Sequence, residues 1–118
     1  MPATGTIEVK ATITGLPGGS TTVGPLTIVS ATAVGERRSP LDLASGSNTL
    51  TIPTGAKALI FIPPTGNTQA LILRPGDASG TGITISKTQP TVLAFEAAPA
   101  SVNINAAGTV AGCEAIFI

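Results

Sequence analysis

Short runs of alternating apolar and polar residues, each ended by glycine or proline, constrain the fold of this chain more than any other feature. Ile7, Val9, Ala11 and Ile13 alternate with polar residues over positions 6–14, and this period of two places the four apolar side chains on one face of an extended strand. Segment 15–20, with three glycines and one proline, ends the run. With 14 glycines and 10 prolines in 118 residues, the chain leaves no room for a helix of three turns.

Eight more segments have the composition or the alternation of β-strands. They cover residues 25–34, 48–52, 56–62, 68–74, 83–86, 91–95, 101–105 and 113–118. Segment 56–62 is apolar on both faces, which predicts a central strand that is covered on both sides. Segment 35–42 is the most charged part of the chain, and Pro40 together with the local polarity predicts a connecting loop there.

This succession of eight or nine short strands, at a spacing of roughly ten residues, predicts an all-β fold. We expect an antiparallel β-sandwich, jelly-roll-like, that forms a single domain over residues 1–118. Residues 1–34 are expected to form either an arm or an extra strand pair. An immunoglobulin-like sandwich is the alternative, although the tryptophan and the cysteine pair that usually mark it are absent.

The chain has no histidine, tyrosine or tryptophan, and only 10% of its residues are charged. Most side chains that transfer protons near neutral pH or hold transition metals are therefore missing. The six acidic residues are scattered, without a close pair of the glycosidase type. Asp77 lies in a loop where calcium is conceivable, but one carboxylate is too little, and we expect it to stabilise the turn. We expect no enzyme activity, no cofactor and no metal site.

The single cysteine, Cys113, cannot form an intramolecular disulfide. A nucleophilic thiolate needs a nearby histidine or a strongly cationic environment, so we expect Cys113 to be a core residue. Phe61, Phe95 and Phe117 stand among apolar neighbours on predicted strands. We expect these rings in the core, where they cannot serve as a stacking platform for sugars or bases.

Six acidic and six basic residues give the chain a formal net charge of zero. No basic patch is present by which nucleic acid or an anionic membrane would be recognised, and no apolar run approaches the ~20 residues that span a bilayer. The first residues lack the basic and apolar regions of a secretory signal, which predicts synthesis in the cytoplasm. A neutral chain has little self-repulsion, and this favours self-association.

Four successive segments carry a family resemblance: 52–64 (IPTGAKALIFIPP), 71–77 (LILRPGD), 80–83 (GTGI) and 90–95 (PTVLAF). In the order of strands and turns, roughly the C-terminal two-thirds of the chain resembles small β-rich virion structural proteins of tailed bacteriophages. The resemblance implies a capsid decoration or cement protein, or a small tail or fibre component, that is often trimeric. It also implies that further copies of the chain and the major capsid protein or a tail protein are its partners, and that it resides in the virion after synthesis in the host cytoplasm.

The function expected from the sequence is that of a non-enzymatic virion structural protein, in the first place one that decorates the capsid. Candidate contact residues are Glu36, Arg37 and Arg38, because paired arginines suit an acidic partner surface, and Ile7, whose strand could be donated to a neighbour. A host- or carbohydrate-binding module is an alternative, although such modules usually display tryptophan or tyrosine. An adhesin or pilus subunit would carry a signal peptide, and a small hydrolase would need an imidazole base.

Overall fold

The computed structural model describes residues 3–15, 17–19, 21–33, 35–75 and 81–118. Within these ranges the chain forms ten β-strands and no helix, so the predicted all-β class is confirmed, with ten strands where eight or nine were expected. The strands are β1 (Ala3–Ile13), β2 (Thr21–Ala33), β3 (Glu36–Leu43), β4 (Gly46–Thr51), β5 (Ala58–Ile62), β6 (Leu71–Pro75), β7 (Ile83–Ile85), β8 (Thr91–Ala94), β9 (Ser101–Ala106) and β10 (Val110–Phe117).

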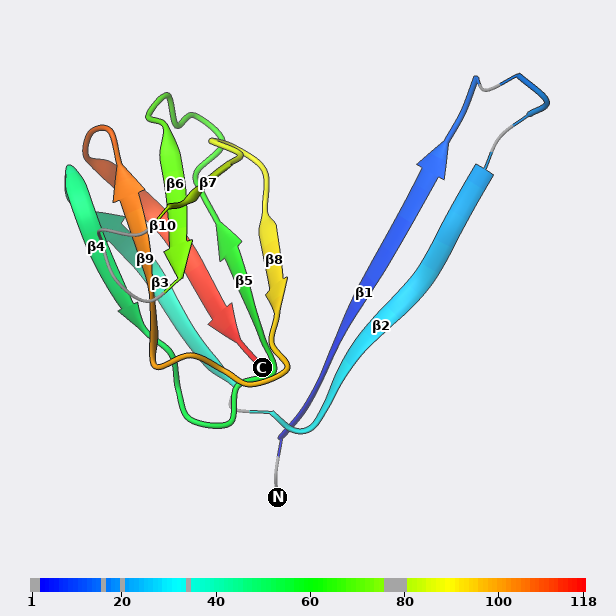
Figure 1. Cartoon of the computed structure of the whole chain (residues 1–118), viewed down its shortest axis with the longest axis horizontal. Coiled ribbons are helices and arrows are strands. Elements are labelled where there is room, and N and C mark those ends of the chain that lie inside the picture. Colours follow the sequence, from blue (N-terminus) through cyan, green and yellow to red (C-terminus); the bar gives the residue numbers. More distant parts are fainter. Residues whose placement is uncertain (1–2, 16, 20, 34, 76–80) are drawn as a thin grey trace.

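Eight of these strands form two antiparallel sheets of four strands each, which face each other (Figure 1). Sheet I has the order β3-β10-β5-β8, and sheet II has the order β4-β9-β6-β7. The pairing is nested, because the first strand of the eight pairs with the last, the second with the seventh, the third with the sixth, and the fourth with the fifth. The predicted antiparallel sandwich is confirmed.

The core lies between the two sheets and follows from the period-two alternation of their strands. On β9, Val102 and Ile104 point inward and are almost completely buried. Sheet I contributes Leu59, Phe61 and Phe117 from β5 and β10, each no more than 2% exposed. The core placement expected for Phe61, Phe117 and Cys113 is confirmed, and Phe95 packs against the same cluster as a partly buried residue.

Strands β1 and β2 form a separate two-stranded antiparallel sheet outside the sandwich, here called the arm. In Figure 1 the arm rises from one end of the sandwich and diverges from it on the side of β8. The Cα radius of gyration of 15.7 Å reflects this projection, since a compact chain of this length has a radius of about 13.5 Å.

Among the described residues, only one of the two buried clusters joins the arm to the sandwich, and it lies near the base of the arm. There Ile7 packs with Ala58 and Ile118 on the outer side of sheet I, and Ile28 and Ile60 flank this second, smaller cluster. Strand β5 therefore has Leu59 and Phe61 in the main core and Ala58 and Ile60 against the base of the arm. This arrangement agrees with the expectation that segment 56–62 is covered on both sides.

The charged segment 35–42 was expected to be a loop, and this expectation is wrong, because Glu36–Leu43 is strand β3. The strand lies at the edge of sheet I and pairs only with β10. An edge strand tolerates a proline, whose missing N–H can face away from the sheet. The pairing of β3 with β10 is irregular between Arg38 and Leu41, where Pro40 lies, so the proline interrupts the ladder without ending the strand.

Candidate interaction surfaces

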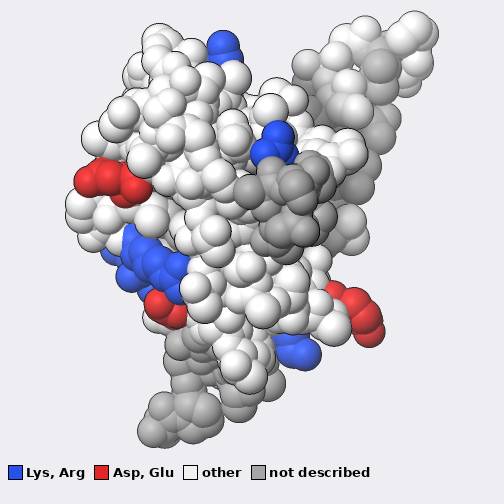
Figure 2. Space-filling view, turned by 60° about the vertical axis from the view of Figure 1, so that its left-hand side comes forward, with Lys and Arg blue, Asp and Glu red and all other residues white. Residues whose placement is uncertain are grey.

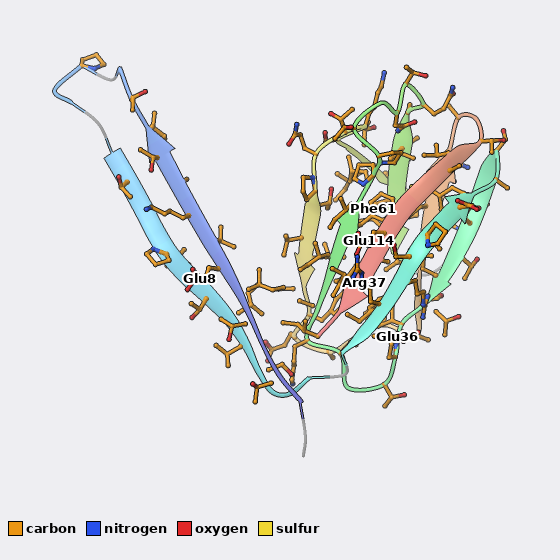
Figure 3. The ribbon with its side chains drawn as sticks, turned by 180° about the vertical axis from the view of Figure 1, so that it is seen from behind. Glu8, Glu36, Arg37, Phe61 and Glu114 are labelled. Carbon is orange, nitrogen blue, oxygen red and sulfur yellow. The ribbon has the colours of Figure 1, made fainter. Side chains whose placement is uncertain are left out.

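The two adjacent arginines of β3 point to opposite sides of sheet I, because successive side chains of a strand alternate. Arg37 lies on the outer face with 64% of its side chain exposed, and its guanidinium Nε forms an ion pair with Glu114 on β10 (Figure 3). The hypothesis of one anchor built from both arginines therefore does not fit the geometry. Of the two arginines, Arg37 is the one whose charge is largely exposed on the outer face of sheet I.

Arg38 is instead part of the edge of the sandwich. Its guanidinium carbon lies 4.8 Å from the centroid of the Phe117 ring, and its Nη2 donates a hydrogen bond of 2.6 Å to the carbonyl oxygen of Thr51. Its Nε donates to the Glu36 carboxylate at 3.1 Å. The guanidinium of Arg38 thus lies over the Phe117 ring and links β3 to the end of β4.

Ile7 is 8% exposed and is already buried against its own sandwich. The sequence analysis proposed Ile7 for a contact with a neighbouring molecule, whereas in the structure Ile7 contacts Ala58 and Ile118 of its own chain. The part of the arm that is open to a neighbour begins beyond Ile7, toward the hairpin end.

Six large apolar side chains are exposed among the described residues, and four of them belong to the arm. These four are Val9, Ile13, Leu26 and Val29. Val9 and Leu26 are directly opposite each other in the β1–β2 pairing, so they lie on the same face as the pair Ile7 and Ile28. The apolar stripe that is buried at the base of the arm therefore continues outward into solvent.

An apolar cleft opens between the edge strands β7 and β8, on the side of the sandwich away from β3 and β4. Core residues Leu73 and Val102 form part of its lining together with Leu93 and Phe95, and its volume is about 260 Å³. Ile83 of β7 also lines the cleft and is 67% exposed. At this edge the exposed side chain of Ile83 thus adjoins buried core residues.

The outer faces of the two sheets differ in character. On sheet II, Asn103 donates a hydrogen bond of 2.5 Å from Nδ2 to the Ser47 hydroxyl oxygen, within a row of serine, threonine and asparagine side chains on β4 and β9. On sheet I, Ile116, Ile60 and Val92 lie opposite one another in the pairing of β10, β5 and β8. One outer face is polar and the other is largely aliphatic, with Arg37 beside it. On the face drawn in Figure 2, most of the described surface is uncharged, and a group of positive side chains lies beside a negative one.

The chemistry of the described residues is limited. Burial raises the pKa of the Cys113 thiol above its ordinary value of 9.0, and the nearby Asp42 carboxylate raises it further.

In the described ranges, no three histidine, cysteine, aspartate or glutamate side chains gather as a set of metal ligands. The Asp77 loop lies outside the described residues. Within the described part of the chain, no helix is long and apolar enough to cross a membrane.

Comparisons of the chain with known protein families, with curated proteins and with solved structures find no match.

Neither the exposed stripe of the arm nor the cleft between β7 and β8 was anticipated from the sequence. The alternation of Val9 and Ile13 predicts an apolar face but does not say whether that face meets its own core. The cleft joins β6, β7, β8 and β9, and no local pattern indicates that these strands meet.

Proposed function

We propose that this protein is a non-enzymatic structural protein of a tailed-phage virion, which associates with itself and decorates the capsid. The observation that carries the proposal is the placement of aliphatic side chains outside the core, on the arm and on the outer face of sheet I. Exposed apolar side chains that lie together usually mark a protein–protein contact. The resemblance of segments 52–64, 71–77, 80–83 and 90–95 to small β-rich virion proteins supports the virion as the assembly in which this contact is made.

The fold suits this role. The nested pairing of the eight sandwich strands supports a jelly-roll assignment, because it is that of a long hairpin folded back on itself into two sheets. Strands β3 to β10 supply a rigid body, while the outer half of the arm and the part of the outer face of sheet I that the base of the arm leaves open supply two contact surfaces. We assign the outer face of sheet I to the shell, because Arg37 can exchange its partner Glu114 for an acidic group of the capsid at little cost.

Binding to the assembled shell and not to its free subunits would stabilise the particle by mass action. Cryo-electron microscopy of particles assembled with and without this protein tests the proposal. We expect extra density on the outer surface of the head only when the protein is present, together with a higher temperature of capsid disruption. Density on the tail would favour the tail or fibre alternative, and particles without any density would exclude a virion role.

Single substitutions of the two arginines sharpen the test. We expect Arg37→Ala to lower occupancy of the shell at least about tenfold while changing the free energy of unfolding by less than about 1 kcal/mol, because its ion pair is exposed. Arg38→Ala is the matched control, and we expect it to destabilise the sandwich by about 2 kcal/mol through the loss of its contacts with Phe117 and Thr51. Occupancy measured by quantitative gel of purified particles would contradict the assignment if Arg37→Ala left it unchanged.

A further inference from the structure

The arm has an apolar face that is covered at its base, and the outer half of this face has no partner among the residues that the structure describes. Ile7 is buried on that face at the base, whereas farther along the same face Val9 is 46%, Leu26 59% and Ile13 48% exposed. The opposite face carries Thr12 and the charged residues Glu8 and Lys10, and Val29 is its exposed apolar residue, near the base and opposite Thr6. A two-stranded ribbon alone is marginally stable in water and gains stability when its apolar face is covered by a third element. The arm therefore needs a surface to lie on.

The edge formed by β7 and β8 offers such a surface. Within the described part of the chain, each of these strands pairs on one side only, β7 with β6 and β8 with β5, so their outer backbone groups can accept another strand. The cleft between them is aliphatic and aromatic, and Ile83 at its opening is the most exposed of the large apolar residues. Because its lining is apolar, it can cover the valine, leucine and isoleucine side chains of the arm.

The solvent-accessible area of the chain indicates how large an area a partner would cover. The chain exposes 6854 Å², whereas a compact monomer of its mass exposes roughly 5,800 Å². The excess of about 1,000 Å² is close to the ~800 Å² that each partner contributes to a stable interface. If this excess were divided between two neighbours in a ring, each contact would bury only about 500 Å² per partner, which is below the standard size. The area therefore favours a single, reciprocal contact.

We propose that two copies of this chain exchange their arms, so that the apolar face of each arm lies along the β7–β8 edge of the other copy. Both complementary surfaces are present on one chain, which is the requirement for a twofold contact in which residue i meets residue j and j meets i. The chain carries no net charge that would oppose the association. The inference rests on the proposed function, because it names the partner in the self-association assumed there and leaves the outer face of sheet I for the shell.

Sedimentation of the purified full chain tests the exchange without any particle. We expect a species of twice the chain mass of 11.6 kDa. Ile13→Asp should raise the dissociation constant at least about tenfold, because it places a charge in the covered apolar stripe. Thr12→Asp is the matched control, since it puts the same carboxylate on the opposite face of the same strand, and we expect it to leave the dissociation constant within about twofold of that of the parent chain.

The β7–β8 edge can be tested with a matched pair of variants of its own. Ile83 lines the cleft, whereas Thr84 lies on the outer face of sheet II, so Ile83→Asp should weaken the dimer about as much as Ile13→Asp does, and Thr84→Asp should not. Circular dichroism of each variant shows whether the sandwich remains folded. Equal effects of Ile83→Asp and Thr84→Asp would overturn the assignment of this edge.

A chemical cross-link tests the contact directly. Since Cys113 is buried, Ile13→Cys and Ile83→Cys provide single accessible thiols on the arm and at the cleft. When the two variants are mixed and treated with a short bismaleimide, we expect a covalent heterodimer linked between positions 13 and 83, identified by mass spectrometry. A strict monomer at high concentration, a trimer, or the absence of this link would each overturn the exchange, whereas head decoration by monomers would leave the proposed function intact.

Discussion

At the scale of single residues, Cys113 is the group whose chemistry the fold most clearly suppresses. It is 0% exposed on β10 and packs between the sheets of the sandwich. A maleimide or a disulfide reagent can reach the thiol only when the sandwich opens. We expect native protein to react at least about a thousandfold more slowly than protein in denaturant, because a domain of this size has a stability of about 5 kcal/mol or more. Measuring the labelling rate with and without urea checks this, and rapid native labelling would contradict it.

The same thiol gives the stability a pH dependence of known sign. Because burial raises its pKa in the folded state, the native chain keeps the proton at a pH where the unfolded chain loses it. The contribution to stability is complete below the pKa of the unfolded thiol and is lost as the pH rises above that value. Cys113→Ala, which has no proton to release, should flatten the decline in unfolding free energy on the alkaline side of pH 9.0.

At the scale of the elements, the arm depends on a bulge in β2 at Gly24. This residue has a φ of +89°, and a Cβ placed on it would lie 2.5 Å from the Val9 carbonyl oxygen. Gly24→Ala should therefore open the arm, with amide exchange in β1 at least about tenfold faster than in the parent chain. Gly18→Ala is the control, because Gly18 has a similar φ of +93° but open space around it. Equal exchange in both variants would show that the collision with Val9 has no effect.

The elements also show what sequence patterns can predict and what they cannot. Strands β5, β9 and β10 were predicted from their short apolar or alternating segments, because the composition and the period of a strand are local properties. Strand β3 was missed, since its charges and Pro40 are typical of a loop, and only its position at the sheet edge makes them compatible with a strand. The split of Arg37 and Arg38 between two faces follows once β3 is known to be a strand. The separation of the arm does not follow from its alternation, because an apolar face can meet its own core or another molecule.

At the scale of the whole molecule, the sandwich and the arm have separate sources of stability. The main core draws its buried residues from positions 43–117, and no arm residue belongs to it. The arm joins the sandwich through Ile7 in the smaller cluster with Ala58 and Ile118. The sandwich should therefore fold without the arm, whereas the arm should not fold without the sandwich.

A shortened chain of residues 36–118 tests this division. We expect a cooperative thermal transition and a β-sheet circular dichroism spectrum, with a free energy of unfolding lower by roughly 3 kcal/mol, because Ile7 and part of Ile28 no longer cover the outer side of sheet I. The full chain with Ile7→Ala is the matched variant, and we expect a similar loss from it, since it removes the main contact and keeps the arm. Loss of the cooperative transition in the shortened chain alone would mean that the arm contributes to the fold of the sandwich beyond this cluster. Equal stabilities of the shortened and the Ile7→Ala chains, both still folded, would make the rest of the arm dispensable for folding and leave it free for contact with another copy.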